Sequence, residues 1–451
     1  MGFRAPQTAP ARAHLQRPTA TLNSVHILIF LDQNPASLGG VQASVLLQQK
    51  YLELAGHRVT VAAPASKFAP KSKPGQIIYP SFPLTLNREY NANANLGRAY
   101  RQIVTELEQI GEPVDVVHVQ ADWWGALLGV GFAQRQNLPL VNTLHTQLMI
   151  GATQVVGAVM ARLLIWTHSE TFGRWVDHQS FRGRGNGWTY LRQICSHSQA
   201  VIAPSGHFAR LAKEMGVAAH LHVVPTGVDD AALEGVFAAQ RRHSGGNGAG
   251  AVPGGAGANT RSGSGQTIGS DEPIVFAWSG RFSQEKRMME FLQAFQLSNI
   301  PAQVQIFGNG PLQKQAEQYI RDNDLQDRVT IVGRVSHTEM LQRLANADAL
   351  IQTSVGFETQ GMTVYEAGVV GTPSVLCDWN IADDLPDGSY WRVANQSTQA
   401  LAASLAEAYE EIRAGRGKHI DLRQSMYQSQ LYKRSIEIYE GAIAAHAASV
   451  A

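Results

Sequence analysis

The 451-residue sequence has only two cysteines, Cys195 and Cys377, too few for a disulfide framework. This scarcity favours a reducing, cytoplasmic compartment. The 37 basic and 36 acidic side chains nearly cancel, so no net charge favours nucleic acid as a partner. No apolar run approaches the roughly 20 residues of a membrane-spanning helix. The length still allows two or three domains with large cores.

Common catalytic motifs are also missing. The sequence contains neither His-Glu-x-x-His nor Gly-x-Ser-x-Gly, and it lacks a Walker-type glycine loop ending in Lys-Ser or Lys-Thr. None of its 15 histidines pairs with cysteines or carboxylates at zinc-like spacing. These absences disfavour ATP hydrolysis and a zinc site, and we expect no metal and no cofactor.

What the sequence does have is an alternation of short apolar runs with helical patterns. Strands are expected at 25–31, 59–63, 115–120, 140–145, 200–203, 222–224, 274–279, 304–308, 329–332, 350–353 and 374–377. Helices are expected at 41–55, 95–109, 207–215, 286–297, 312–322, 338–345, 363–370 and 429–445. This alternation predicts the α/β class, with two doubly wound, Rossmann-like domains facing one another across a cleft.

One segment interrupts the alternation. Residues 240–270 are mostly Gly, Ser, Asn and Ala, which cannot bury enough surface to fold. The expected organisation is a disordered tail (1–24), an N-terminal domain (25–235), a flexible linker (236–272), a C-terminal domain (273–428) and a final helix (429–451), with packing back on the N-terminal domain as one option. The tail carries Arg4, Arg12 and Arg17 and lacks the apolar core of a secretory signal, so disorder is preferred over a weak membrane contact.

Several polar side chains fall at the ends of predicted strands, where open parallel sheets bind ligands. Arg281 follows the strand at 274–279, and Lys286 lies five residues later, at a helix start. Two cations beside a helix N-terminus make a diphosphate site, although solvated surface cations explain them equally well. His145 ends another strand, where it can contact a sugar or a phosphate, but a lone histidine is more often structural.

Glycines and two carboxylates mark further strand ends. Gly39-Gly40 opens a helix and permits close approach of an anion, with a plain tight turn as the favoured alternative. Gly308-Asn309-Gly310 leaves room for a base or ribose, or is a bare turn. Glu358 should lie in a strand-to-helix turn, and Glu366 in the helix that follows.

In their order along the chain, these motifs resemble those of retaining glycosyltransferases of family 4, which have the GT-B fold. The match is carried by Gly39-Gly40-Val41, 55–61, 114–119, 225–229, 280–286, 307–311 and Glu358-x7-Glu366 with Gly371-Thr372-Pro373 after it, and it spans roughly 25–394. The tetrapeptide Glu-Thr-Gln-Gly at 358–361 resembles that of bacterial enzymes that glucosylate diacylglycerol. The linker is unusually long for this family.

The resemblance implies a role for each matching residue. Arg281 and Lys286 would hold the donor diphosphate, Glu358 and His145 would lie near the donor sugar, and these four form the expected catalytic set. Glu366 would bind the ribose hydroxyls. The other implied donor contacts are Gly40, Gly280, Gly308, Asn309, Gly310 and the backbone of Thr359, Gln360, Gly361 and Met362. The family includes metal-independent members, which agrees with the missing metal motif.

The implied reaction moves a hexose from a UDP- or GDP-hexose to a hydroxyl of a lipid or glycan. Residues 155–167 are apolar except for Arg162 and Thr167, and the arginines at 174, 182, 184 and 192 follow. This pattern suits a peripheral contact with the inner face of the cell membrane, and a core helix with a solvated basic loop explains it equally well. Two other readings stay open: a nucleotide-sugar epimerase or other GT-B enzyme without a lipid acceptor, and a catalytically silent nucleotide-binding scaffold.

Overall fold

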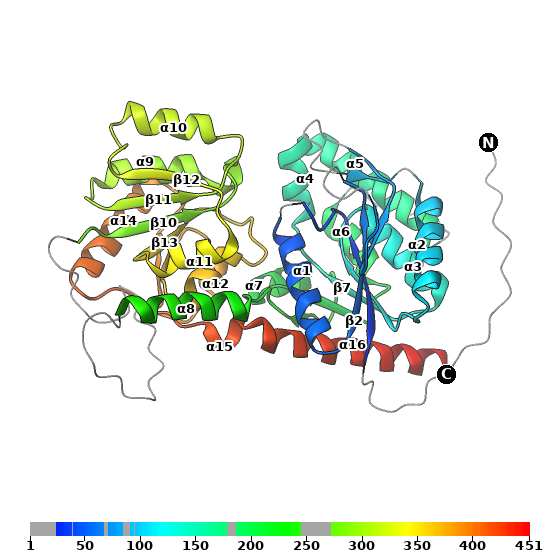
Figure 1. The fold of residues 1–451 in the computed structure, drawn as a ribbon. Coiled ribbons are helices and arrows are strands. Elements are labelled where there is room, and N and C mark those ends of the chain that lie inside the picture. Colours follow the sequence, from blue (N-terminus) through cyan, green and yellow to red (C-terminus); the bar gives the residue numbers. More distant parts are fainter. Residues whose placement is uncertain are drawn as a thin grey trace.

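The structure is a computed structural model that describes residues 24–37, 39–66, 71–83, 91–93, 95–177, 186–244 and 272–451. Nearly all of the expected tail and residues 245–271 of the expected linker therefore lie outside the described residues, as do Arg182 and Arg184. Figure 1 shows two α/β lobes side by side, with α8 and α16 beneath them.

The first lobe is built on a seven-stranded parallel sheet with the order β3-β2-β1-β6-β7-β8-β9. The strands are β1 (His26–Leu31), β2 (Arg58–Pro64), β3 (Gln76–Tyr79), β6 (Val116–Gln120), β7 (Leu140–Thr143), β8 (Ala200–Ala203) and β9 (His222–Val223). Side chains of β1 and β6 are buried along their whole length, because helices cover both faces of a parallel sheet.

Helices pack on both faces of this first sheet. They are α1 (Gly40–Leu54), α2 (Leu96–Ile110), α3 (Trp124–Gln136), α4 (Leu148–Val156), α5 (Ala158–Phe172), α6 (Gly187–Cys195) and α7 (Gly206–Glu214). A short π-helix, η1 (Gly173–Asp177), extends α5. Strands β4 (Phe82–Pro83) and β5 (Asn91–Ala92) pair as a separate two-stranded antiparallel ribbon. One apolar core lies under α2, α3, α5 and α6, and a second lies under α1.

The second lobe repeats the architecture with a six-stranded parallel sheet in the order β12-β11-β10-β13-β14-β15. Its strands are β10 (Val275–Ser279), β11 (Gln303–Phe307), β12 (Val329–Gly333), β13 (Ala349–Gln352), β14 (Ser374–Leu376) and β15 (Tyr390–Arg392). Its helices are α9 (Met288–Ser298), α10 (Gln313–Asp322), α11 (His337–Ala345), α12 (Met362–Val369), α13 (Trp379–Ala382), α14 (Thr398–Arg413) and α15 (Arg423–Met426), with a short 3-10 turn η2 (Gln284–Lys286) before α9. The predicted fold class is confirmed.

In each sheet the strand order reverses once. The reversal lies between β1 and β6 in the first lobe and between β10 and β13 in the second. Loops that leave the carboxyl ends of these strands diverge, and the crevice between them is the usual ligand site of such sheets. The loops after β1, β6, β10 and β13 are therefore the candidate ligand-binding loops.

Two helices join the lobes (Figure 1). Helix α8 (Asp230–Ser244) follows the last strand of the first lobe, yet its Leu233 and Val236 are buried in the core of the second. Helix α16 (Gln428–Val450) follows the second lobe, yet its Ile438 and Tyr439 are buried against the first sheet. Each lobe thus contributes one helix to the other.

The expected linker begins too early. Residues 236–244 belong to α8 rather than to a flexible segment. The physical reason is the spacing of Leu233, Val236 and Phe237, which places three apolar side chains on one helical face against the second lobe. The abundance of small residues after position 238 obscured this helix in the sequence.

Candidate active site

The centre of the site is an ion pair between the two loops at the switch point of the second sheet. Lys286 comes from η2 after β10, and Glu358 comes from the loop after β13. The Nζ atom of Lys286 lies 2.5 Å from Oε1 of Glu358. Ser354 donates a second hydrogen bond to the same oxygen, at 2.7 Å. The predicted residues Lys286 and Glu358 are thus in direct contact.

This pairing keeps Glu358 ionised. Burial acts to raise the pKa of Glu358, but the charge of Lys286 and the hydrogen bonds from Lys286 and Ser354 outweigh it and lower the pKa. Lys286 is itself fixed, because its ammonium lies 5.6 Å from the ring centre of Phe357. The site therefore offers a fixed cation and a fixed anion side by side.

Arg281 is exposed on the loop that follows β10. The loop is held from behind by Gly308-Asn309-Gly310, since Phe282 donates its N–H to the Asn309 carbonyl at 2.9 Å. A Cβ at Gly308 would lie 2.0 Å from the Gly280 carbonyl oxygen, and one at Gly310 would lie 2.6 Å from that of Phe282. These two glycines are therefore required by backbone packing that positions the Arg281 loop.

Two helix N-termini approach each other across the crevice. Gly40 opens α1 in the first lobe, and Met362 opens α12 in the second. A Cβ at Gly40 would lie 3.4 Å from Sδ of Met362. Gly361 caps α12 with a φ of 80°, a conformation that glycine adopts without strain. Both helix ends present positive partial charge to this place, which suits an anion.

Glu366 lies on α12 and points toward α11. Its Oε1 is 3.0 Å from Nε2 of His337 at the start of α11. The hydrogen bond to Glu366 raises the pKa of His337 against the opposing effect of burial. Sequence reasoning missed His337, because a lone exposed histidine carries no motif.

His145 follows β7 in the first lobe, and its Nε2 lies 2.9 Å from Oε1 of Gln120. Burial lowers the pKa of His145 to about 4, so the imidazole is neutral near pH 7. Thr359 ties the two lobes together here, because its hydroxyl donates to the His145 carbonyl at 3.0 Å. His145 is thereby joined to the loop that carries Glu358.

Gln360 was expected to contact the donor through its backbone, and its side chain binds the first lobe instead of the donor site. The amide accepts from the Thr226 N–H at 2.9 Å and donates to the Thr226 carbonyl at 2.9 Å. The side chains of Thr359 and Gln360 thus bind the first lobe, which leaves only their backbone for a donor. The sequence could not reveal this, since Thr226 lies more than a hundred residues away.

Two carboxylates at the switch point of the first sheet, of which Asp122 is buried, were also missed. Asp32 follows β1 and accepts from the backbone N–H groups of Asp122, Trp123 and Gly125, at 2.6, 2.9 and 2.9 Å. Burial and the nearby Asp32 raise the pKa of Asp122, after β6, to about 7. Thr146, next to His145, donates a short hydrogen bond to Asp122. The sequence held one signal for them, because each Asp stands just after a predicted strand.

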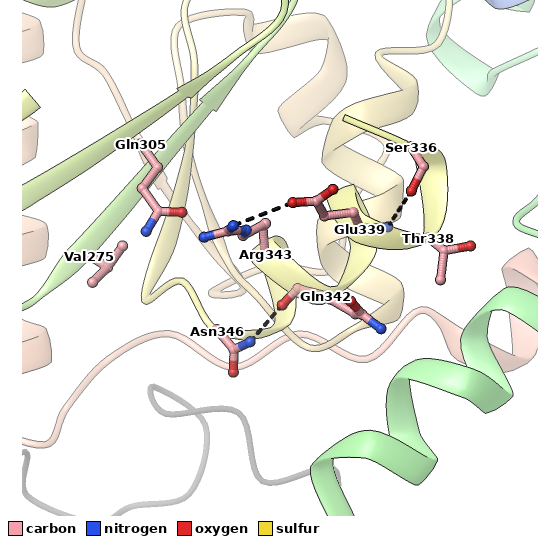
Figure 2. Close-up of a pocket in the computed structure, with 8 residues that line it drawn as sticks. All are labelled: Val275, Gln305, Ser336, Thr338, Glu339, Gln342, Arg343 and Asn346. Carbon is pink, nitrogen blue, oxygen red and sulfur yellow. Dashed lines mark hydrogen bonds and ion pairs between the residues drawn. The ribbon is translucent and has the colours of Figure 1, made fainter. Parts of the chain in front are cut away.

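No group of three or more His, Cys, Asp or Glu side chains with metal-site geometry occurs among the described residues. Within the same part of the chain, none of the helices has the length and apolar character needed to cross a bilayer. A surface hollow of about 610 Å³ lies beside α11, and Lys286 is not among the residues that line it (Figure 2). Its Arg343 and Glu339 pair with each other at 3.3 Å, so it offers no uncompensated charge for a diphosphate.

Comparison with known proteins agrees with this geometry. Residues 38–232 match the family model described as Glycosyltransferase Family 4, and residues 265–417 match the model described as Glycosyl transferases group 1. The alpha-monoglucosyldiacylglycerol synthase of Streptococcus pneumoniae is 24% identical over 394 residues, which cover 85% of this chain and 78% of that protein.

Solved structures share the fold. Sucrose-phosphate synthase from Thermosynechococcus elongatus has a TM-score of 0.64 at 19% identity, covering 94% of this chain and 100% of that one. HepE from Anabaena, solved with UDP-glucose, has a TM-score of 0.60 at 16% identity, covering 92% and 99%. Since the two family models together span most of the sequence, the chain belongs to the family 4 type of glycosyltransferases, with the GT-B fold.

Proposed function

We propose that this glycosyltransferase moves a hexose from a nucleoside-diphosphate hexose to a hydroxyl of a membrane lipid, with retention of anomeric configuration. The proposal of a nucleoside-diphosphate donor rests on the contact between Lys286 and Glu358 at the switch point of the second sheet. Support for a uridine donor comes from HepE, which was solved with UDP and with UDP-glucose.

The chemistry needs stabilisation of a leaving diphosphate. Lys286 and Arg281 supply positive charge on that side, and the N-termini of α1 and α12 supply N–H dipoles opposite each other. His337 and Glu366 would hold the ribose end. His145, neutral at physiological pH, would contact the donor sugar as a hydrogen-bonding group.

Retention follows most simply from attack on the same face of the sugar as the departing diphosphate. Glu358 is occupied by Lys286 and Ser354, which favours an electrostatic role beside the reacting carbon over nucleophilic attack. A double displacement would need a free carboxylate on the opposite face of the sugar.

The surface of α5 supports the proposal that the acceptor is a membrane lipid. Val159 is 85% exposed, and Met160, Leu163 and Trp166 are 44–48% exposed on the same side of the helix. Arg162 and Arg174 are exposed nearby, so the helix combines an apolar stripe with positive charge, as peripheral membrane helices do. Helices α4 and α5 lie at one end of the first lobe (Figure 1). The Streptococcus pneumoniae relative is named as a glycolipid synthase.

The test is transfer of radiolabelled sugar from UDP-glucose, UDP-galactose, UDP-N-acetylglucosamine and GDP-mannose. Each is offered with vesicles of diacylglycerol and anionic phospholipid, and separately with soluble glycans. We expect label in the organic phase, from a uridine donor, with vesicles only. Lys286→Ala and Glu358→Gln should each lower transfer by about 100-fold or more.

Lys418→Ala is the matched control, because Lys418 pairs with Glu411 at 3.2 Å in the same lobe but outside the site. It should transfer as well as wild type. Label on soluble glycans alone would refute the lipid acceptor. If the donor is converted to another nucleotide sugar without any acceptor, the enzyme is an epimerase and not a transferase. Full activity of both site variants would refute the site.

A further inference from the structure

Helix α7 of the first lobe begins against the second lobe, behind the loop that carries Glu358. The side chain of Asp384, just after α13, accepts the backbone N–H of His207 at 2.8 Å and lies 2.7 Å from its Nδ1. A Cβ at Gly206 would lie 2.7 Å from Oδ1 of Asp384, so only glycine lets the carboxylate come this close. Asp384 thus caps a helix of the other lobe, where the helix dipole favours a negative charge.

His207 uses its second ring nitrogen on the donor loop. Its Nε2 lies 3.2 Å from the backbone carbonyl oxygen of Glu358. Ser205 donates to the next carbonyl, that of Thr359, at 2.5 Å. A carboxylate and a carbonyl both accept hydrogen bonds, so both contacts of His207 form together when each ring nitrogen carries a proton. The side chains of His207 and Asp384 are 7% and 9% exposed, so water competes little for these bonds.

Glu358 is therefore held from two sides. Its carboxylate is fixed by Lys286 and Ser354 from the second lobe, and its carbonyl is fixed by His207 from the first. The complete arrangement therefore needs residues of both lobes. Charges that bear on the pair are those of Arg210, which donates to Asp384 at 3.1 Å, of Asp378 and of the Glu358 carboxylate itself.

We propose that His207 is a positioning residue: clamped by Asp384, it fixes the backbone of Glu358 and so aims that carboxylate at the donor sugar. The proposal rests on the role proposed above for Glu358. It predicts that the contact of Nε2 with the Glu358 carbonyl matters for turnover, beyond any contribution of the His207–Asp384 pair to folding.

Two substitutions separate the two ring nitrogens. The side-chain amide nitrogen of His207→Gln can replace Nε2 and keep the bond to Glu358, whereas that of His207→Asn can replace only Nδ1 and keep the bond to Asp384. In both variants Asp384 retains Arg210 and the backbone N–H of residue 207. His197→Ala is the control, because His197 pairs with Asp177 at 2.8 Å wholly within the first lobe.

Kinetics of sugar transfer over a series of donor concentrations give kcat and KM for each variant, and melting curves monitor folding. We expect His207→Asn to lower kcat by about 10- to 100-fold, with the donor KM within about threefold of wild type. His207→Gln and His197→Ala should stay within about threefold in both constants.

Equal kcat values for the Asn and Gln variants, whether lowered or unchanged, would overturn the proposal if Glu358→Gln still abolishes transfer. Full transfer by Glu358→Gln would instead remove the role proposed for Glu358, and the positioning role of His207 with it. The two failures are therefore distinguishable in one set of assays.

Discussion

At the scale of single residues, the tautomer of the neutral His145 ring is set by one neighbour. The amide of Gln120 is oriented by its donation to Oε1 of Gln48 at 2.6 Å, so its own oxygen faces His145. An amide oxygen only accepts, hence Nε2 of His145 carries the proton and Nδ1 keeps its lone pair. The neutral ring can then accept a hydrogen bond from a sugar hydroxyl.

Gln120→Glu should make activity more dependent on pH than it is in the wild type. A carboxylate beside Nε2 raises the pKa of His145 from about 4 toward the ordinary value near 6.5. The ring then gains a proton as the pH falls, and Nδ1 can no longer accept. We expect kcat/KM of the variant to fall several-fold more than that of wild type between about pH 8 and pH 5.5. Gln120→Met, which adds no charge, is the control, and superimposable profiles for wild type and the Glu variant would exclude this role of His145.

That Lys286 and Glu358 lie close together could be predicted, but the contacts between the lobes could not. Lys286 follows β10 and Glu358 follows β13, and the carboxyl ends of these neighbouring parallel strands lie at the same edge of the sheet. His207 and Asp384 are 177 positions apart, on different lobes, and neither stands in a motif. Such contacts depend on how the lobes dock, a property that local patterns do not encode.

At the scale of elements, α16 brings a buried polar contact into the first lobe. The Tyr439 hydroxyl lies 2.8 Å from Nδ1 of His118 on β6 and accepts from Gln48 of α1 at 3.0 Å. All three side chains are buried. Helix α16 is thus joined to the central strand of the sheet by hydrogen bonds as well as by its apolar face.

Tyr439→Phe should destabilise the protein by about 1–3 kcal/mol, because it leaves His118 and Gln48 each short of a buried partner. Urea unfolding followed by circular dichroism measures the loss. Tyr432→Phe is the control on the same helix, where the side chain is only partly buried, and it should change stability by less than about 0.5 kcal/mol. An unchanged midpoint for Tyr439→Phe would mean that water replaces the hydroxyl without cost.

Central strands, long amphipathic helices and the edge strands β9 and β12 could be predicted at this scale, whereas the edge strands β3 and β15 and the covering helix α3 could not. The run Ala200–Ala203 is a strand as expected, because a buried parallel strand needs a continuous apolar sequence. The edge strands β3 and β15 have three or four residues each and mixed sequences. Helix α3 contains three glycines, which lower helix propensity, but a Cβ at Gly125 would lie 2.6 Å from the Leu31 backbone.

At the scale of the whole molecule, the lobes are joined by two chain segments that run side by side. Val228 donates to the Met426 carbonyl at 2.8 Å, and Gln428 donates back to the Val228 carbonyl at 3.1 Å. Gly227 lies where they cross, and its N–H donates to Oε1 of Gln428 at 3.1 Å. Closure of the lobes must take place about this paired crossing, which therefore has to stay compact.

Gly227→Ala tests the crossing directly. Its Cβ would lie 2.7 Å from Oε1 of Gln428 and 2.8 Å from the backbone oxygen of Met426, so the two segments must separate. We expect a loss of about 1–3 kcal/mol in unfolding free energy from this overpacking, together with a raised donor KM from poorer closure. Gly235→Ala in α8 is the matched control, because a Cβ there meets nothing within 4 Å. Alanine should stabilise that helix by about 0.5–1 kcal/mol, so the same substitution should have opposite signs at the two positions. Equal effects at both glycines would show that the crossing relaxes without cost and does not constrain closure.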